Sequence, residues 1–106
     1  MTEGPAYPTV GPDTVPVRRL DSRVRSVGGR FLVAGPTSAL ELDVTARSVW
    51  RAIDGGRSVS AIARSLADEY DVDPGTAVGD VVELVEELVR CEVVTLRQPS
   101  PRRGPG

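Results

Sequence analysis

The spacing of apolar residues predicts three helices in the second half of the chain. In residues 44–53 and 59–70, apolar side chains recur every three or four positions, which places them on one face of a helix. They are Val44, Ala46, Val49, Trp50 and Ile53 in the first segment, and Val59, Ile62, Ala63, Leu66 and Tyr70 in the second. Residues 74–90 form the third segment, whose apolar side chains cover about 160° of a helical wheel.

The residues at the ends of these segments support the same three helices. Asp43, Ser58 and Asp73 each stand just before a segment, where a side-chain oxygen can accept a hydrogen bond from a free amide of the first turn. Pro74 occupies the first helical position, which proline favours. The glycine pair at 55–56 is typical of a helix end.

Residues 23–42 alternate short apolar runs with turn residues and predict a small antiparallel sheet. Gly28-Gly29 and residues 35–38 are expected to form its two turns. In the third strand, residues 39–42, the two leucines share one face, while the alanine and the glutamate share the other.

Two further segments complete the predicted fold. A last strand is expected at residues 93–96, and Val15, Val17 and Leu20 indicate an extended segment before the sheet. The predicted fold is therefore α+β and winged-helix-like, with a three-stranded antiparallel sheet followed by three helices.

Proline and glycine are frequent at both ends of the chain of 106 residues. Neither end shows an apolar period, so neither is expected to bury enough surface to offset the entropy lost on ordering. We expect disordered tails at residues 1–16 and 97–106, on either side of a single domain at residues 17–96.

The available side chains argue against catalysis. Histidine and lysine are absent, and Cys91 is the single cysteine. Without histidine, Ser-His-Asp and Cys-His arrangements and the commonest zinc sites cannot form. We therefore expect a protein that is not an enzyme and binds no metal or cofactor.

Charge and hydropathy bound the partners and the location. The net charge of −2 gives no general attraction to nucleic acid or to an anionic membrane. The chain has no apolar run long enough to span a bilayer and no cleavable signal pattern at its start. These features predict a cytoplasmic protein that does not associate with membranes.

The helix at residues 74–90 has a wider apolar arc than the roughly 100° that a surface helix needs. Contact with the last strand explains part of the surplus, and contact with a partner is the other interpretation. The third strand leaves an unpaired backbone edge. If that edge lies beside one margin of the helix, the two form a groove that can capture an extended peptide by strand addition.

Two other functions fit the same elements. A winged-helix transcriptional regulator would place the third helix in the major groove of DNA, but residues 74–90 carry four acidic side chains against Arg90 alone. A dimeric adaptor would use the free edge of the sheet for pairing with itself.

The chain resembles the PqqD family over residues 23–96. The resemblance rests on short motifs in matching order and spacing, namely Leu42-Asp43-Val44-Thr45-Ala46, Trp50, Ile53-Asp54-Gly55, Ser58-Val59, Ile62-Ala63 and Asp80-Val81. Family members are RiPP recognition elements, which bind the leader segment of a ribosomally made precursor peptide and present it to modifying enzymes. Two positions depart from the family pattern. Asp43 replaces the usual asparagine, but aspartate also caps a helix. Val85 stands where a bulkier apolar residue is common, and this smaller side chain could reshape the groove.

The resemblance also implies a binding site and partners. The leader would pair antiparallel with the third strand and lie against the third helix. The residues implied to pair with the leader backbone are Ser38, Ala39, Leu40, Glu41 and Leu42. The implied walls of the groove are Val78, Val81, Val82 and Val85. The implied charges at its rim, which could meet Arg or Lys of the leader, are Asp80, Glu83 and Glu87.

The expected partners are a precursor peptide and an enzyme such as a leader peptidase, a cyclase or a radical enzyme, in a lasso-peptide or radical-enzyme pathway. The chain itself is expected to be a monomer or a weak dimer.

Overall fold

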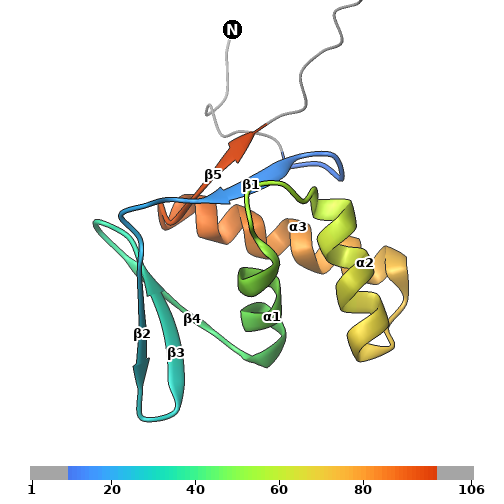
Figure 1. Ribbon diagram of the computed structural model, residues 1–106. Helices are drawn as coiled ribbons and strands as arrows, with labels where there is room; N and C mark the ends of the chain where they lie inside the picture. The colour runs from blue at the N-terminus through green and yellow to red at the C-terminus, as the bar shows by residue number, and fades with distance from the viewer. Residues whose placement is uncertain (1–9, 98–106) are drawn as a thin grey trace, which may run out of the picture.

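The computed structural model describes residues 10–97, which form two small sheets and three helices (Figure 1). In chain order the elements are β1 (Val15–Arg18), β2 (Arg23–Val27), β3 (Arg30–Ala34), β4 (Ala39–Leu42), α1 (Val44–Ala52), α2 (Val59–Tyr70), α3 (Pro74–Arg90) and β5 (Val94–Arg97). The α+β class, the three helices and the three-stranded antiparallel sheet are confirmed.

The helices begin where the capping residues predicted. The side chains of Asp43, Ser58 and Asp73 accept hydrogen bonds from the backbone amides of Ala46, Ala61 and Thr76 respectively. Each cap satisfies one of the amide groups that the first turn of a helix leaves without an intrahelical partner. Three short polar side chains thus fix where all three helices start.

The larger sheet has the strand order β2-β3-β4, and all its pairings are antiparallel. Gly28 and Gly29 connect β2 to β3 with φ angles of 57° and 83°, the positive values that a tight two-residue hairpin turn requires. The hairpin projects beside α1, and β4 leads directly into that helix (Figure 1). Among the described strands, β4 pairs with β3 alone, so its other edge is free.

A second sheet, which no local sequence pattern indicates, joins the two ends of the described chain. In this sheet β1 pairs antiparallel with β5, with Val15 opposite Arg97. The two strands lie together over α3 (Figure 1). The expected extended segment is thus a strand, but it ends at Arg18, so Leu20 takes no part in it and is fully exposed.

The packed region begins earlier than residue 17, the expected start of the domain. Val10 and Thr14 are buried, with 8% and 2% of their surfaces exposed. The carbonyls of Pro12 and Thr14 accept hydrogen bonds of 2.9 Å from the amides of Ser60 and Val59, two donors of the first turn of α2. Residues 10–16 therefore belong to the folded domain, and Arg97 extends β5 by one residue beyond residue 96. The other residues of the expected tails, 1–9 and 98–106, lie outside the described residues.

The core is formed by the three helices together with residues of both sheets, including Val94 of β5. Val33 and Leu42 contribute from the larger sheet, and Trp50 and Ile53 contribute from α1. No helix within residues 10–97 has the length and apolar composition needed to cross a membrane.

Candidate functional site

The free edge of β4 presents backbone groups at alternate residues. The amide of Gly35 donates a 2.8 Å hydrogen bond to the carbonyl of Ser38, so these two residues form a hydrogen-bonded pair at the start of the β3–β4 ladder. In an antiparallel ladder such pairs alternate with pairs whose amides and carbonyls point away from each other. With the observed register, Ala39 and Glu41 therefore direct their backbone groups toward the free edge.

A groove runs from this edge toward the helices and consists of two adjoining pockets. The strand pocket encloses about 310 Å³ and is lined by Leu40, Glu41, Asp43, Ala46, Leu84 and Glu87. The helix pocket encloses about 380 Å³ and is lined by Asp43, Thr45, Ala46, Val49, Leu66, Asp80, Glu83, Leu84 and Glu87. The two pockets share Asp43, Ala46, Leu84 and Glu87, so they form one continuous surface depression. Residues of β4 and of α3 thus line the same pocket.

The margin of α3 in the groove differs from the one that the sequence analysis implied. Val81 and Val85 have no exposed surface and belong to the core, so neither is a groove wall. Val78 and Val82 are half-buried against the core, and neither lines the two pockets. On a wheel of 100° per residue, Val78 and Val82 lie on one side of the buried face of α3, and the residues that line the groove lie on the other side.

The groove side of α3 consists of Asp80, Glu83, Leu84 and Glu87. The three acidic residues were expected at the rim, whereas Leu84 was missed. The sequence contained a signal for Leu84, because it stands four positions after Asp80 and three before Glu87 and so shares their face. The contributions of Thr45, Ala46, Val49 and Leu66 depend on how α1 and α2 pack, and no local pattern indicates them.

The five residues expected on the strand side fall into two groups. Leu42 is buried and Leu40 is half-buried on the core face, whereas Ser38, Ala39 and Glu41 are exposed. Of the five, only Leu40 and Glu41 line the strand pocket.

The acidic groups of the groove differ in their partners. The Arg30 guanidinium lies 2.9 Å from a carboxylate oxygen of Glu41, and this hydrogen-bonded ion pair lowers the pKa of Glu41 below its usual value. The carboxylate of Asp43 accepts the capping hydrogen bond of α1. Within residues 10–97, Asp80, Glu83 and Glu87 form no ion pair. The α3 side of the groove is therefore the side whose negative charge is not neutralised by any described residue.

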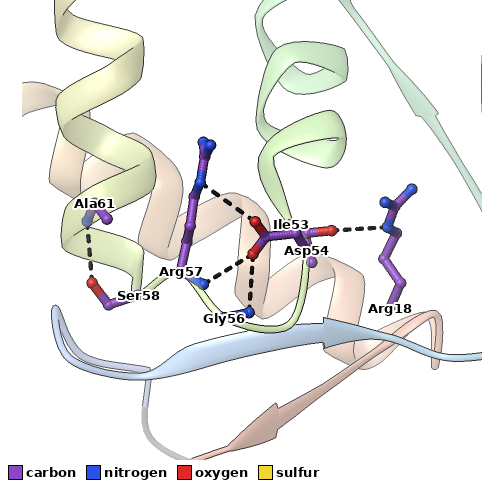
Figure 2. A network of polar contacts seen from close by, with 7 residues as sticks. All are labelled: Arg18, Ile53, Asp54, Gly56, Arg57, Ser58 and Ala61. Atoms are coloured by element: carbon purple, nitrogen blue, oxygen red, sulfur yellow. Dashed lines mark hydrogen bonds and ion pairs between the residues drawn. The ribbon is translucent and has the colours of Figure 1, made fainter.

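The loop after α1 is held by a separate polar network (Figure 2). One carboxylate oxygen of Asp54 accepts hydrogen bonds from the amides of Gly56 and Arg57, at 2.9 and 3.0 Å. The hydrogen bond from Gly56 is the main cause of the lowered pKa of Asp54. Arg18 of β1 donates to the carbonyl of Ile53 at 2.9 Å. The end of α1 is thus fixed to the second sheet, which keeps the helix in place beside the groove.

The described residues of the site can bind a polypeptide, but they include no set of metal ligands. Within residues 10–97, no group of three His, Cys, Asp or Glu side chains is arranged to hold a metal ion. A backbone edge, an apolar floor and a row of carboxylates can hold an extended polypeptide through its main chain and through alternate side chains.

Fold and site together define a small α+β domain with a groove between the edge of a sheet and a helix. Comparison with known sequences identifies the particular family within that class. The model of the family described as "Coenzyme PQQ synthesis protein D (PqqD)" matches residues 29–94, and the chain belongs to this family.

Related sequences and solved structures agree with this assignment. A PqqA binding protein of Xanthomonas axonopodis pv. citri is 35% identical over 86 residues, which cover 79% of this chain and 94% of that protein. A PqqA binding protein of Xanthomonas campestris pv. campestris (strain B100) is 33% identical over 90 residues, covering 83% of this chain and 98% of that one.

Two solved structures share the fold. The solution structure of the PqqD part of Methylobacterium extorquens PqqCD, described as a functional stand-alone RiPP recognition element, has a TM-score of 0.65 and 28% identity, and the match covers 76% of this chain and 88% of that one. The crystal structure of PqqD from Xanthomonas campestris has a TM-score of 0.53 and 29% identity, with 82% and 99% covered.

Proposed function

We propose that this protein binds the leader segment of a ribosomally made precursor peptide and delivers it to a modifying enzyme, without doing chemistry of its own. The names of its relatives support a peptide partner, because they are PqqA binding proteins, and one structural neighbour is a RiPP recognition element. The observation that carries the proposal is the free edge of β4 beside the groove that continues to α3.

In the proposed complex the leader adds a strand to the larger sheet. Its main chain pairs with Ala39 and Glu41, the two residues whose backbone groups point to the free edge. Its side chains alternate between the groove and solvent, so every second residue is read by the pockets. Main-chain pairing supplies affinity for any extended segment, and the pockets supply selectivity.

Delivery to the enzyme follows from holding two partners at once. A leader tethered to a protein that also contacts the enzyme meets that enzyme at a higher effective concentration than a free leader does. A leader peptidase, a cyclase or a radical enzyme could each be served in this way, in a lasso-peptide or a radical-enzyme pathway.

DNA binding is disfavoured by the exposed side of α3. The residues that a recognition helix would bring to the phosphates include Asp80, Glu83 and Glu87, and none of them is paired with a cation within residues 10–97. These carboxylates would repel the DNA backbone.

Two substitutions at one position test the strand-addition geometry. Glu41→Pro removes an amide that faces the guest and leaves the β3–β4 hydrogen bonds in place, because proline is tolerated where the amide points out of an edge strand. We expect calorimetric titration with the leader of the precursor encoded beside this gene to show binding weakened by about tenfold. The loss combines one missing hydrogen bond to the leader with steric crowding of the leader by the proline ring.

The matched control is Glu41→Gln, which also removes the carboxylate and its exposed ion pair with Arg30 but keeps the amide. It should change affinity by no more than about threefold, because an exposed ion pair is typically worth about 0.5 kcal/mol, a factor of about two in an equilibrium constant. Equal affinity of the proline and glutamine variants would show that the leader does not pair with this edge.

A further inference from the structure

We propose that the groove selects leaders that carry an arginine or lysine at one inward-facing position, and that this side chain occupies the helix pocket. The selection rests on the proposed function, because it requires a peptide at the β4 edge. It adds the chemical class of the residue that the groove recognises.

The shape of the groove calls for a long side chain. The strand pocket includes Leu40 and Glu41 of β4, so the side chain of a residue paired with this strand enters it directly. The helix pocket has no lining residue from β4 and extends instead to Leu66 of α2. A side chain of the bound peptide must therefore pass over Ala46 and Leu84, which both pockets share, before it reaches the end of the helix pocket near Leu66.

The floor of the helix pocket suits an aliphatic stem. Val49 and Leu66 are nearly covered by the protein, with 2% and 4% of their surfaces exposed, and Ala46 and Leu84 are half-buried beside them. Arginine and lysine side chains commonly lay their methylene groups on such apolar surface and keep the charged end in a polar environment.

The rim of the helix pocket suits a positive charge at the end of that stem. Asp80, Glu83 and Glu87 follow one another along the same side of α3, and none is paired with a cation within residues 10–97. Among the described residues, none that lines the pocket is basic. The positive end of the α1 dipole, worth about half a charge, is offset by its cap Asp43. A guanidinium can form paired hydrogen bonds with such carboxylates.

The positive charge is better supplied by a peptide side chain than by a metal ion. The carboxylates are not gathered around one point, since no group of three potential metal ligands occurs in the described part of the chain. They are spread over two turns of a helix that borders a groove, an arrangement that a long flexible cation can follow.

A selection experiment tests the inference without knowledge of the natural leader. The full chain is immobilised and panned against a phage-displayed library of random dodecapeptides. We expect the selected peptides to share arginine or lysine at one position, with an apolar residue two positions away that fits the strand pocket beside Leu40 and Leu84.

A second measurement isolates the charge. In a synthetic copy of the best selected peptide, the basic residue is made arginine and then replaced by its neutral isostere citrulline, which should weaken binding about tenfold. The variant D80N/E83Q/E87Q should bind both peptides equally. The control D68N/E69Q/E86Q removes the same number of charges from residues outside both pockets and should keep the tenfold difference.

The outcomes separate this inference from the proposed function. Selected peptides that pair with β4 but show no basic preference, or a citrulline peptide that binds as well as its arginine parent, would overturn the inference and leave peptide binding intact. Failure to select any peptide, together with failure to bind the neighbouring precursor's leader, would remove both.

Discussion

Gly35 stands where the turn after β3 passes the end of α3. A methyl group at this residue would overlap the carbonyl oxygen of Cys91, so the close approach of two backbones requires glycine here. We expect Gly35→Ala to lower the free energy of unfolding by about 1–3 kcal/mol, because one backbone segment must move. Urea unfolding followed by circular dichroism measures the change.

Gly79 is the matched control for that substitution. It lies within α3, and a methyl group there would meet nothing within 4 Å. Gly79→Ala should therefore raise the free energy of unfolding by about 0.5–1 kcal/mol, the usual gain when alanine replaces glycine inside a helix. Similar effects of the two substitutions would contradict the packing around Gly35.

Asp54 predicts a pH dependence of stability. Its carboxylate accepts hydrogen bonds from Gly56 and Arg57, and its pKa is lower than that of an ordinary aspartate. A lowered folded-state pKa stabilises the protein above the unfolded-state pKa, and this contribution is lost as the pH falls through the folded-state value. Asp54→Asn keeps an acceptor oxygen but loses the charge.

The difference in unfolding free energy between the wild-type protein and Asp54→Asn should therefore shrink as the pH falls from about 5 to about 2. Urea titrations at several pH values measure it. A difference that stays constant over this range would show that the charge of Asp54 contributes nothing to the turn.

At the scale of elements, α3 packs against the core and lines the groove with different residues. Val85 is fully buried, whereas its neighbour Leu84 is half-buried and lines both pockets. Leu84→Ala should weaken leader binding by about tenfold with a small loss of stability, because it removes apolar surface that the guest would cover.

Val85→Ala should show the reverse pattern. It should lower the free energy of unfolding by about 2 kcal/mol through the cavity that it creates in the core. Its affinity for the leader should be unchanged under conditions where the variant is folded. Calorimetry and urea unfolding on both variants test the division, and a larger affinity loss for Val85→Ala would place the groove on the other margin of α3.

The helices and strands themselves could be predicted from local sequence signals, but the contacts between elements distant in sequence could not. Asp43, Ser58 and Asp73 act within one turn of the chain, so the sequence identifies where each helix begins. The pairing of Val15 with Arg97 joins residues from opposite ends of the described chain, and no local pattern specifies it. The same limit applies to the groove, since the wheel of α3 shows two flanks of the apolar face and only packing decides which one borders β4.

At the scale of the whole molecule, the free edge and the groove belong to one continuous surface. The larger sheet stands at one side of the helices, and β4, its strand nearest α1, leads into that helix (Figure 1). The β1–β5 sheet lies over α3 (Figure 1), and none of its residues lines the two pockets of the groove. Its strands pair only with each other, so they leave the β4 edge open. No described strand therefore pairs with the edge at which the proposed leader would add to the sheet.

Amide hydrogen exchange of β4, read by NMR with and without the leader of the neighbouring precursor, tests this account most directly. In the free protein the amides of Leu40 and Leu42 are bonded to β3, whereas those of Ala39 and Glu41 face the open edge. The account predicts that leader binding slows exchange at Ala39 and Glu41 and changes Leu40 and Leu42 far less. Saturated leader binding that leaves exchange at Ala39 and Glu41 unchanged would contradict it.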